Sequence, residues 1–182
     1  MEKILLTTER LNIRKLQAAD LDDFHLYRSN PEVTKYQGFD VMNKEQAINF
    51  ITDQKEKLLG EAGEWIYYGL EDFSTQQLIG DCAIMFHASD SRIVEIGITI
   101  SHLHQKKGYG KEVLIGLLSF LFDTKQVLRI IEIVDTRNTG SIKLLESIGF
   151  RKEGHFIENV WFKGKWANEY QYALLKREWK KR

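Results

Sequence analysis

The stretch HQKKGYG, from His104 to Gly110, sets two lysines and two glycines directly in front of a run of apolar residues. That run, VLIGLLSFLF at 113–122, has the composition of a buried helix, and a strand-like segment, RIVEIGITI at 92–100, precedes the loop. The first N–H groups of a helix have no partner within it, and the helix dipole makes that end positive. A strand, a glycine-containing loop and a helix in this order therefore predict an anion site.

The residue types in the loop fit a phosphate ligand. Gly108 and Gly110 lack the Cβ atoms that would keep a diphosphate away from the backbone amides. Positive charge at the rim comes from Lys106, Lys107 and Lys111. The loop matches neither the G-x-x-x-x-G-K-[ST] motif nor the three-glycine dinucleotide motif. These residues alone leave two interpretations open, a phosphate site and a solvated loop in front of a core helix.

The chain outside this loop has the pattern of an α/β layer fold. Alternating or β-branched residues predict seven strands, at 11–16, 65–71, 77–87, 92–100, 129–135, near 150–162 and near 168–176. Apolar periodicity predicts four helices, at 20–29, 44–59, 108–122 and 139–149. Short turns separate the three strands between residues 65 and 100, which makes them antiparallel neighbours. We therefore expect a mixed central sheet of about seven strands flanked by about four helices.

Local signals place the ends of these elements. Asp20 is positioned to cap the helix at 20–29, and Asn43 with Gln46 resembles a capping box for the helix at 44–59. Gly149 is expected to end the helix at 139–149 in the left-handed backbone conformation. Residues 163–165 (KGK) are expected to form a hairpin turn between the last two strands. The expected apolar side of the 44–59 helix consists of Ala47, Ile48, Phe50, Ile51 and Leu58.

Composition excludes several classes of protein. With 182 residues, 43% of them hydrophobic, the chain fits a single domain at 1–182 with a substantial core. Its longest apolar run is about half the roughly 20 residues of a membrane span, and its start lacks a signal-peptide pattern. Twenty-six basic and 26 acidic residues give zero net charge, which argues against general nucleic-acid affinity.

The single cysteine and the histidines indicate neither a disulfide nor a metal site. Cys82 is alone, so it fits a reducing compartment and a cytoplasmic location, and its apolar neighbours predict a buried, inert thiol. No metal-ligand spacing links His87, His102, His104 and His155, four of the five histidines. We therefore expect these histidines on the surface or in loops and no bound metal.

Several motifs together resemble the GNAT family of N-acetyltransferases. The loop matches the family signature Q/R-x-x-G-x-G/A, and it has the expected companions in the expected order. These are TERLNIRKL at 8–16, VEIGITI at 94–100, NTGS at 138–141, ESIGFRKEG at 146–154, and KGKW with YALLKREW at the C-terminal end. The set is similar to the branch that contains the ribosomal-protein N-terminal acetyltransferases. The resemblance spans nearly the whole chain and implies the GNAT fold.

This resemblance implies acetyl-CoA as cosubstrate. In the family, the loop amides hold the pyrophosphate, a role that passes here to Gln105, Lys106, Lys107, Gly108, Tyr109, Gly110 and Lys111. The preceding strand resembles the family's splayed strand, whose free backbone edge pairs with the pantetheine arm. The matching positions are Ile98, Thr99 and Ile100, and an N–H at this edge is placed to polarise the thioester carbonyl.

The resemblance also suggests residues for proton transfer on the cofactor side. Asn138 matches the asparagine that reaches the pantetheine arm, although it is equally suited to cap the helix after it. Many family members carry a tyrosine acid where this chain has Leu145, so that donor is absent here. Ser141 is the candidate acid in the resembling branch. Its alternative role is that of a first-turn residue bonded to the backbone.

Two carboxylates are candidates for the general base, because an amine must lose a proton before it attacks a thioester. Glu95 lies on the strand that leads to the expected acetyl site, and Glu158 lies on the strand after Gly154. Each acts either directly or through water. The alternative for each is a strand carboxylate that faces solvent or pairs with a lysine.

We therefore expect an acetyl-CoA-dependent N-acetyltransferase that acts by direct attack of a primary amine in a ternary complex. The acceptor suggested by the branch is a protein N-terminus, and the alternative is a small amine such as a polyamine or an aminoglycoside. A non-catalytic acyl-CoA-binding module is the rival of a different class. A homodimer through the aromatic C-terminal strands is a further expectation, with a monomer as its alternative.

Overall fold

The computed structural model describes residues 4–179, and these form one eight-stranded sheet with helices on both faces. The strand order is β1-β2-β3-β4-β5-β6-β8-β7. The strands are β1 (Ile4–Thr7), β2 (Leu11–Lys15), β3 (Trp65–Asp72), β4 (Leu78–His87), β5 (Asp90–Ile100), β6 (Arg129–Asp135), β7 (Arg151–Phe162) and β8 (Lys165–Leu175). The α/β fold and all seven predicted strands are confirmed, and β1 is an additional edge strand. The domain predicted at 1–182 includes residues 1–3 and 180–182, which lie outside the described residues.

The four predicted helices are also present, with shorter ends. They are α1 (Leu21–Arg28), α3 (Lys44–Glu56), α4 (Tyr109–Ser119) and α5 (Thr139–Ile148). Three short helical elements were not predicted: η1 (Ala18–Asp20), α2 (Pro31–Thr34) and α6 (Lys176–Trp179). The end of the helix predicted at 108–122 is a separate π-helical turn, η2 (Phe120–Thr124). In the described part of the chain, no helix is long and apolar enough to cross a membrane.

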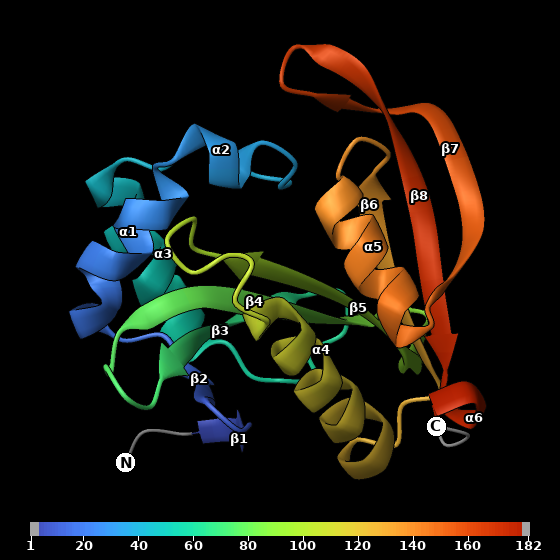
Figure 1. Cartoon of the computed structure of the whole chain (residues 1–182), viewed down its shortest axis with the longest axis horizontal. Coiled ribbons are helices and arrows are strands. Elements are labelled where there is room, and N and C mark those ends of the chain that lie inside the picture. The colour runs from blue at the N-terminus through green and yellow to red at the C-terminus, as the bar shows by residue number, and fades with distance from the viewer. Residues whose placement is uncertain (1–3, 180–182) are drawn as a thin grey trace.

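The sheet is mixed because one of its neighbouring pairs is parallel. Strands β1 to β5 follow each other antiparallel, while β5 and β6 are parallel. This parallel ladder covers only three register positions, from Ile93↔Arg129 to Glu95↔Ile131. Beyond it the two strands separate, and Figure 1 shows β6, β8 and β7 turning away from the direction of β3, β4 and β5. The sheet therefore opens at its middle, where the family signature predicts a splayed strand.

Two apolar clusters hold the helices on opposite faces of the sheet. The larger packs α4 and α5 against the sheet and includes Val113, Leu117, Leu145 and Ile148, all nearly inaccessible to solvent. The smaller lies under α1 and α3 and contains Phe24, Tyr27, Ala47 and Ile51. The opening between β5 and β6 therefore lies between these two helical layers.

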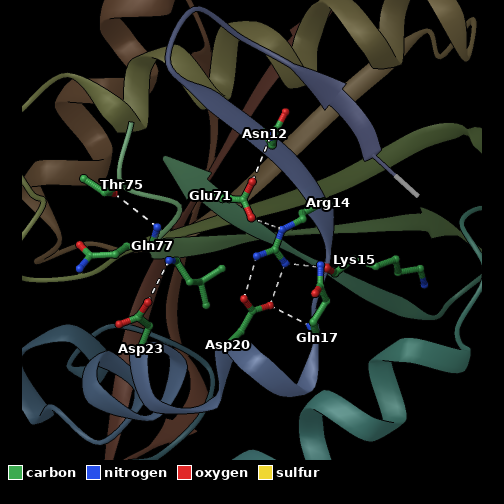
Figure 2. Close-up of polar contacts among 10 residues, drawn as sticks. Asn12, Arg14, Lys15, Gln17, Asp20, Asp23, Glu71, Thr75 and Gln77 are labelled. Carbon is green, nitrogen blue, oxygen red and sulfur yellow. Dashed lines mark hydrogen bonds and ion pairs between the residues drawn. The ribbon is translucent and has the colours of Figure 1, made fainter. Parts of the chain in front are cut away.

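Two expectations about helix packing and capping were wrong. Asp20 precedes α1 but does not cap it with its side chain. Its carboxylate instead accepts hydrogen bonds from Nη1 and Nη2 of Arg14 at 2.8 Å each and from the backbone N–H of Gln17 at 2.8 Å (Figure 2). On α3, Ile48 is 46% exposed, and Leu58 lies beyond the end of the helix and is 64% exposed. The buried side of α3 is therefore narrower than its apolar pattern suggests.

Other local predictions are confirmed. Asn43 and Gln46 form a reciprocal capping box at the start of α3. Gly149 ends α5 in the left-handed conformation, with φ of 96°. Cys82 is fully buried, and desolvation together with the neighbouring Asp81 raises the pKa of its thiol. That thiol is therefore poorly placed to act as a nucleophile.

Candidate active site

The separated edge of β5 is the first element of the site. Ile98, Thr99 and Ile100 pair with β4 on one side of the strand, opposite Cys82, Asp81 and Gly80. No residue of β6 pairs with β5 beyond Glu95 in the described structure. The other edge of β5 at Ile98, Thr99 and Ile100 therefore faces the opening. An extended ligand can add to the sheet there through backbone hydrogen bonds.

The start of α4 is the second element, and its backbone is open at the end that faces the loop. Gly108 is the N-cap residue in the left-handed conformation, with φ of 85°, and no side chain caps the helix. The first N–H groups of α4 are therefore available to an anion. Lys106 also has a positive φ, 61°, and it is exposed together with Lys107 and Lys111.

Contacts with the turn between β1 and β2 fix this helix start in place. Glu112 accepts the hydroxyl of Thr8 at 2.6 Å, and the backbone N–H and Nε of Arg10 at 2.7 Å each. The guanidinium of Arg10 also donates to the carbonyl of Lys107 at 3.1 Å and lies over the ring of Tyr109. Burial opposes ionisation of Glu112, but the bonds from Thr8 and Arg10 outweigh it and lower the pKa of this carboxyl.

The two glycines of the loop have different structural roles. Gly108 needs its left-handed backbone, which a residue with a side chain rarely adopts. At Gly110, a Cβ would lie 3.3 Å from Cδ2 of Leu144 on α5. This glycine therefore allows α4 and α5 to pack closely, as they do in Figure 1, in addition to any role of its N–H toward a ligand.

Asn138 and Ser141 lie at the start of α5, on the face of the sheet that α4 covers. The amide oxygen of Asn138 accepts the N–H of Ser141 at 3.2 Å, so the capping role that the sequence left open is present. The hydroxyl of Ser141 donates to Oε1 of Glu132 on β6 at 3.1 Å. Leu145, which replaces the family's tyrosine, is fully buried in the core.

Glu132 is a residue of the site that the sequence reasoning missed. It directly follows Ile131, the last residue of β6 that pairs with β5. Desolvation raises the pKa of Glu132 to about 7; the bond from Ser141 opposes this rise, and the charge of Glu95 adds to it. The available sequence signal was a single acidic residue within the apolar strand RIIEIVD.

A cavity of about 580 Å³ lies on the other face of the opening. Its walls come from α3 and the segment before it, from β3 to β6, and from the ends of β7 and β8. Four carboxylates line it, Asp81, Glu95, Asp135 and Glu169. The aromatic lining consists of Tyr36, Phe39, Phe50, Trp65, Tyr67, Trp161 and Phe162.

Two of the four carboxylates are neutralised by arginines. Asp81 accepts two bonds from the fully buried Arg28, at 2.8 and 3.2 Å, and one from the hydroxyl of Tyr27 at 2.7 Å. Asp135 forms an ion pair with Arg137. These two groups therefore serve the local structure of the cavity wall.

The other two carboxylates of the cavity have no cationic partner in the described structure. Desolvation, and then the charge of Glu169, raises the pKa of Glu95. Glu169 accepts the side-chain amide of Asn159 at 2.6 Å. An aromatic cavity with two unneutralised carboxylates favours a cationic ligand such as an ammonium group.

The other predicted base, Glu158, is not part of this cavity. It is exposed at an irregularity of β7, with φ of 47°, and its N–H donates to the side chain of Asn168 at 2.8 Å. The structure therefore brings Ser141 close to Glu132 and Glu95 into the cavity, but places Glu158 outside the lining. Within residues 4–179, no three metal-ligating side chains come together.

Comparisons with known proteins agree with this geometry. A profile described as the acetyltransferase (GNAT) domain matches residues 10–151. The uncharacterized N-acetyltransferase p20 of Bacillus licheniformis is 35% identical over 178 residues, which cover 96% of this chain and 97% of the relative. A GNAT-family acetyltransferase from Bacillus anthracis has the same fold, with a TM-score of 0.84 and 29% identity over 98% of this chain and 100% of that structure.

Two more distant relatives have named acceptors, and these differ in chemistry. The alanine N-acetyltransferase of ribosomal protein uS5 from Escherichia coli is 28% identical, over 64% of this chain and 61% of the relative. The spermidine N(1)-acetyltransferase of Vibrio cholerae is 24% identical, over 91% of this chain and 93% of the relative.

Proposed function

The chain belongs to the GNAT acetyltransferase family, and we propose that it acetylates a primary amine held in the carboxylate-lined cavity between β5 and β6. The coarse activity follows from the family: the protein is an acetyl-CoA-dependent N-acetyltransferase. We further propose which residues take part, direct transfer in a ternary complex, and the class of acceptor. We also propose that the whole chain, residues 1–182, is one catalytic domain.

The observation that carries the proposal is the position of the cavity at the end of the β5–β6 ladder. Glu95 is the last residue of β5 in that ladder, and it also lines the cavity. A cosubstrate that lies along the free edge of β5 would have its reactive end at this point. An amine in the cavity would then meet the acetyl group from the opposite face of the sheet.

The residues around the loop fit acetyl-CoA. The uncapped start of α4 and the exposed Lys106, Lys107 and Lys111 suit its phosphates. The edge at Ile98, Thr99 and Ile100 suits its pantetheine arm, which needs backbone partners, and we assign Asn138, at the start of α5, to the same arm. Acetyl-CoA supplies an activated acyl group, so the protein has to orient the two reactants and manage protons.

We assign the general base to Glu95. Its carboxylate lines the cavity, has no cationic partner among the described residues, and has a raised pKa. A base of this kind accepts a proton from the bound ammonium, directly or through water, so that the free amine can attack. Glu158 lies outside the lining and is the weaker candidate. Ser141, on the opposite face, is assigned to the departing thiolate.

For the acceptor, we propose the α-amine of a polypeptide with a small first residue. The 580 Å³ cavity has room for an amine and one or two residues, and the uS5-alanine relative acts on an acceptor of that kind. A polyamine is the second candidate, because two unneutralised carboxylates and several aromatic rings also suit a cation with more than one charge.

A panel of amines tests the proposal. We would incubate the protein with acetyl-CoA and three probes: a synthetic hexapeptide that begins with alanine, spermidine, and an aminoglycoside. Mass spectrometry should show one added acetyl group, at the α-amine of the peptide. Preferred acetylation of spermidine would support the second candidate. Tight binding of acetyl-CoA without acetylation of any probe would favour a non-catalytic acyl-CoA-binding module.

We also propose that the protein forms a homodimer. Trp161 and Trp166, at the end of the β7–β8 hairpin, are 61% and 56% exposed and form a T-shaped pair, and Ile157 nearby is 70% exposed. Exposed aromatic side chains of this kind are enriched at protein interfaces. Light scattering at micromolar concentration should give twice the 21.3 kDa of one chain, whereas a value near 21.3 kDa would refute the dimer.

We also propose a cytoplasmic location, which fits the single, buried Cys82.

A further inference from the structure

The hydrogen bond between Ser141 and Glu132 joins the candidate acid to a carboxyl group that the family signature does not contain. Ser141 lies in the first turn of α5 and Glu132 on β6, with 3.1 Å between Oγ and Oε1. Both side chains are only partly accessible to solvent. The pair lies where β5 and β6 separate, on the opposite face of the sheet from Glu95.

A serine hydroxyl has a chemical problem as the proton donor to a thiolate. It is a far weaker acid than a thiol, whose pKa is about 8.5 in a free cysteine. A serine that gave up its proton without replacement would be left as an alkoxide, which is less stable than the thiolate it neutralised. Ser141 can therefore act as the donor only if a second group replaces its proton in the same step.

We propose that Glu132 is the proton source of the acid side, and that it acts through Ser141. The inference rests on the proposed function. When Glu132 holds its proton, the carboxyl O–H donates to Oγ of Ser141 across the same 3.1 Å contact, so the Ser141 hydroxyl proton is free to point to the ligand. As the C–N bond forms and the C–S bond breaks, Ser141 gives that hydroxyl proton to the sulfur of CoA and takes the carboxyl proton of Glu132. Ser141 ends neutral, and Glu132 ends as a carboxylate. Before the next turnover, Glu132 regains a proton from solvent, which has received the proton lost by the amine.

The surroundings of Glu132 suit this role. The acidic and hydroxyl groups near it are Ser141 on α5, Glu95 on β5 and Tyr172, its register partner on β8. The phenol of Tyr172 donates to Glu146 of α5 at 2.9 Å, so it is engaged elsewhere. No cation pairs with Glu132 among the described residues. Its pKa of about 7 lets a substantial fraction of Glu132 hold a proton at neutral pH.

The first test measures the protonation of Glu132 without turnover. In protein labelled with carbon-13 at the glutamate side-chain carboxyl, the resonance that disappears in Glu132→Gln belongs to Glu132. Its titration midpoint should lie near pH 7, and Ser141→Ala should raise that midpoint, because the bond from Ser141 favours the carboxylate. A midpoint near the ordinary value of 4.5, or one that is unaffected by Ser141→Ala, would overturn the proposal.

The second test compares turnover of Glu132→Gln with that of a matched variant. Glutamine keeps a hydrogen-bonding group of the same length but holds no titratable proton, so kcat should fall about 100-fold, the low end of general-acid effects. The fall of kcat at alkaline pH that reflects loss of the Glu132 proton should disappear in the variant. Glu146→Gln, on the helix that carries Ser141, should leave kcat unchanged. Wild-type kcat and an unchanged pH profile in Glu132→Gln would overturn the relay.

Failure of the relay and failure of the proposed function can be told apart. Hydrolysis of acetyl-CoA without an amine also breaks the C–S bond, so the same variants can be compared in that reaction. A wild type that acetylates no amine, but whose hydrolysis falls in Glu132→Gln, would refute the proposed acceptor chemistry and support the relay. If neither reaction can be measured, the titration midpoint of Glu132 decides.

Discussion

Glu95 on β5 pairs with Ile131 on β6 in the last register position that joins the two strands. The next residue along β6 is Glu132, and successive side chains of a strand point to opposite faces. Glu95 therefore lines the cavity on the α3 side, whereas Glu132 contacts Ser141 on the α5 side. The proposed base and the proposed acid therefore lie on opposite faces of the sheet, at the point where it opens.

Replacement of Glu95 tests the base assignment. Glu95→Gln should lower kcat about 100-fold or more and flatten the rising acid limb of the pH–rate profile, because it removes the group that accepts the amine proton. Steady-state rates between pH 5 and 9 measure both effects. Glu45→Gln, at the exposed start of α3, is the control that should behave as wild type. Loss of the acid limb in Glu158→Gln instead would move the base to β7.

Gly108 offers a test of the anion site that separates binding from folding. Asparagine tolerates the left-handed backbone better than other residues, so Gly108→Asn should fold with a small loss of stability, whereas Gly108→Val should lose about 1–2 kcal/mol. A new Cβ would meet only Nη2 of Arg10, at 3.5 Å, which is ordinary contact.

Both Gly108 variants should bind acetyl-CoA at least about 10-fold more weakly than the wild type does. The reason is that the added side chain keeps a phosphate away from the loop amides. Calorimetry measures this affinity, and urea denaturation measures the stability. An unchanged dissociation constant in well-folded Gly108→Asn would show that no phosphate approaches this Cα.

The lysines of the loop predict a salt-dependent affinity. Exposed charges are screened by salt, and the Debye length falls several-fold between about 0.05 and 0.5 M. The dissociation constant of acetyl-CoA should therefore rise over that range. Substitution of Lys106, Lys107 and Lys111 by glutamine should reduce the slope. An identical slope in the triple variant would assign the salt dependence to other groups.

The fold could be predicted from the sequence because the patterns that indicate its elements are local. Strand alternation, the capping box of Asn43 and Gln46, and the glycine-rich loop depend on residues a few positions apart, and all of these are present. Ile48 and Leu58 were misjudged because an apolar pattern does not say how wide a surface the sheet offers. Asp20 was misjudged because Arg14, a partner from β2, competes with the helix for its carboxylate.

The sequence suggested candidate site residues only where a motif specifies them. The loop and Ser141 belong to family motifs, but the role of Glu132 depends on a contact between a strand and a helix. Glu169 reaches the cavity because β8 pairs with β6, placing it opposite Asp135. A single sequence contains no signal for such contacts between distant elements, so the placement of these two carboxylates at the site became visible only in the structure.

The raised pKa of Glu132 predicts that its removal stabilises the protein at alkaline pH. Between about pH 4.5 and 7, the folded state binds more protons at this group than the unfolded state, so the unfolding free energy falls as pH rises. Glu132→Gln does not carry this cost. Its unfolding free energy should exceed that of wild type by about 1–3 kcal/mol at pH 8 and match it at pH 4. Urea denaturation at the two pH values measures the difference.

Replacement of Glu112 should have the opposite effect on the unfolding free energy in the same experiment. Its pKa is lowered in the folded state, so its contribution to stability is present above the unfolded pKa and is lost as pH falls through the folded value. Glu112→Gln should therefore be less stable than wild type at pH 8, by about 1–3 kcal/mol, because Thr8 and Arg10 lose a charged acceptor. That deficit should shrink toward pH 3. If Glu132→Gln were also destabilised at pH 8, the carboxyl of Glu132 would contribute to folding as an anion and could not hold the proton that the relay requires.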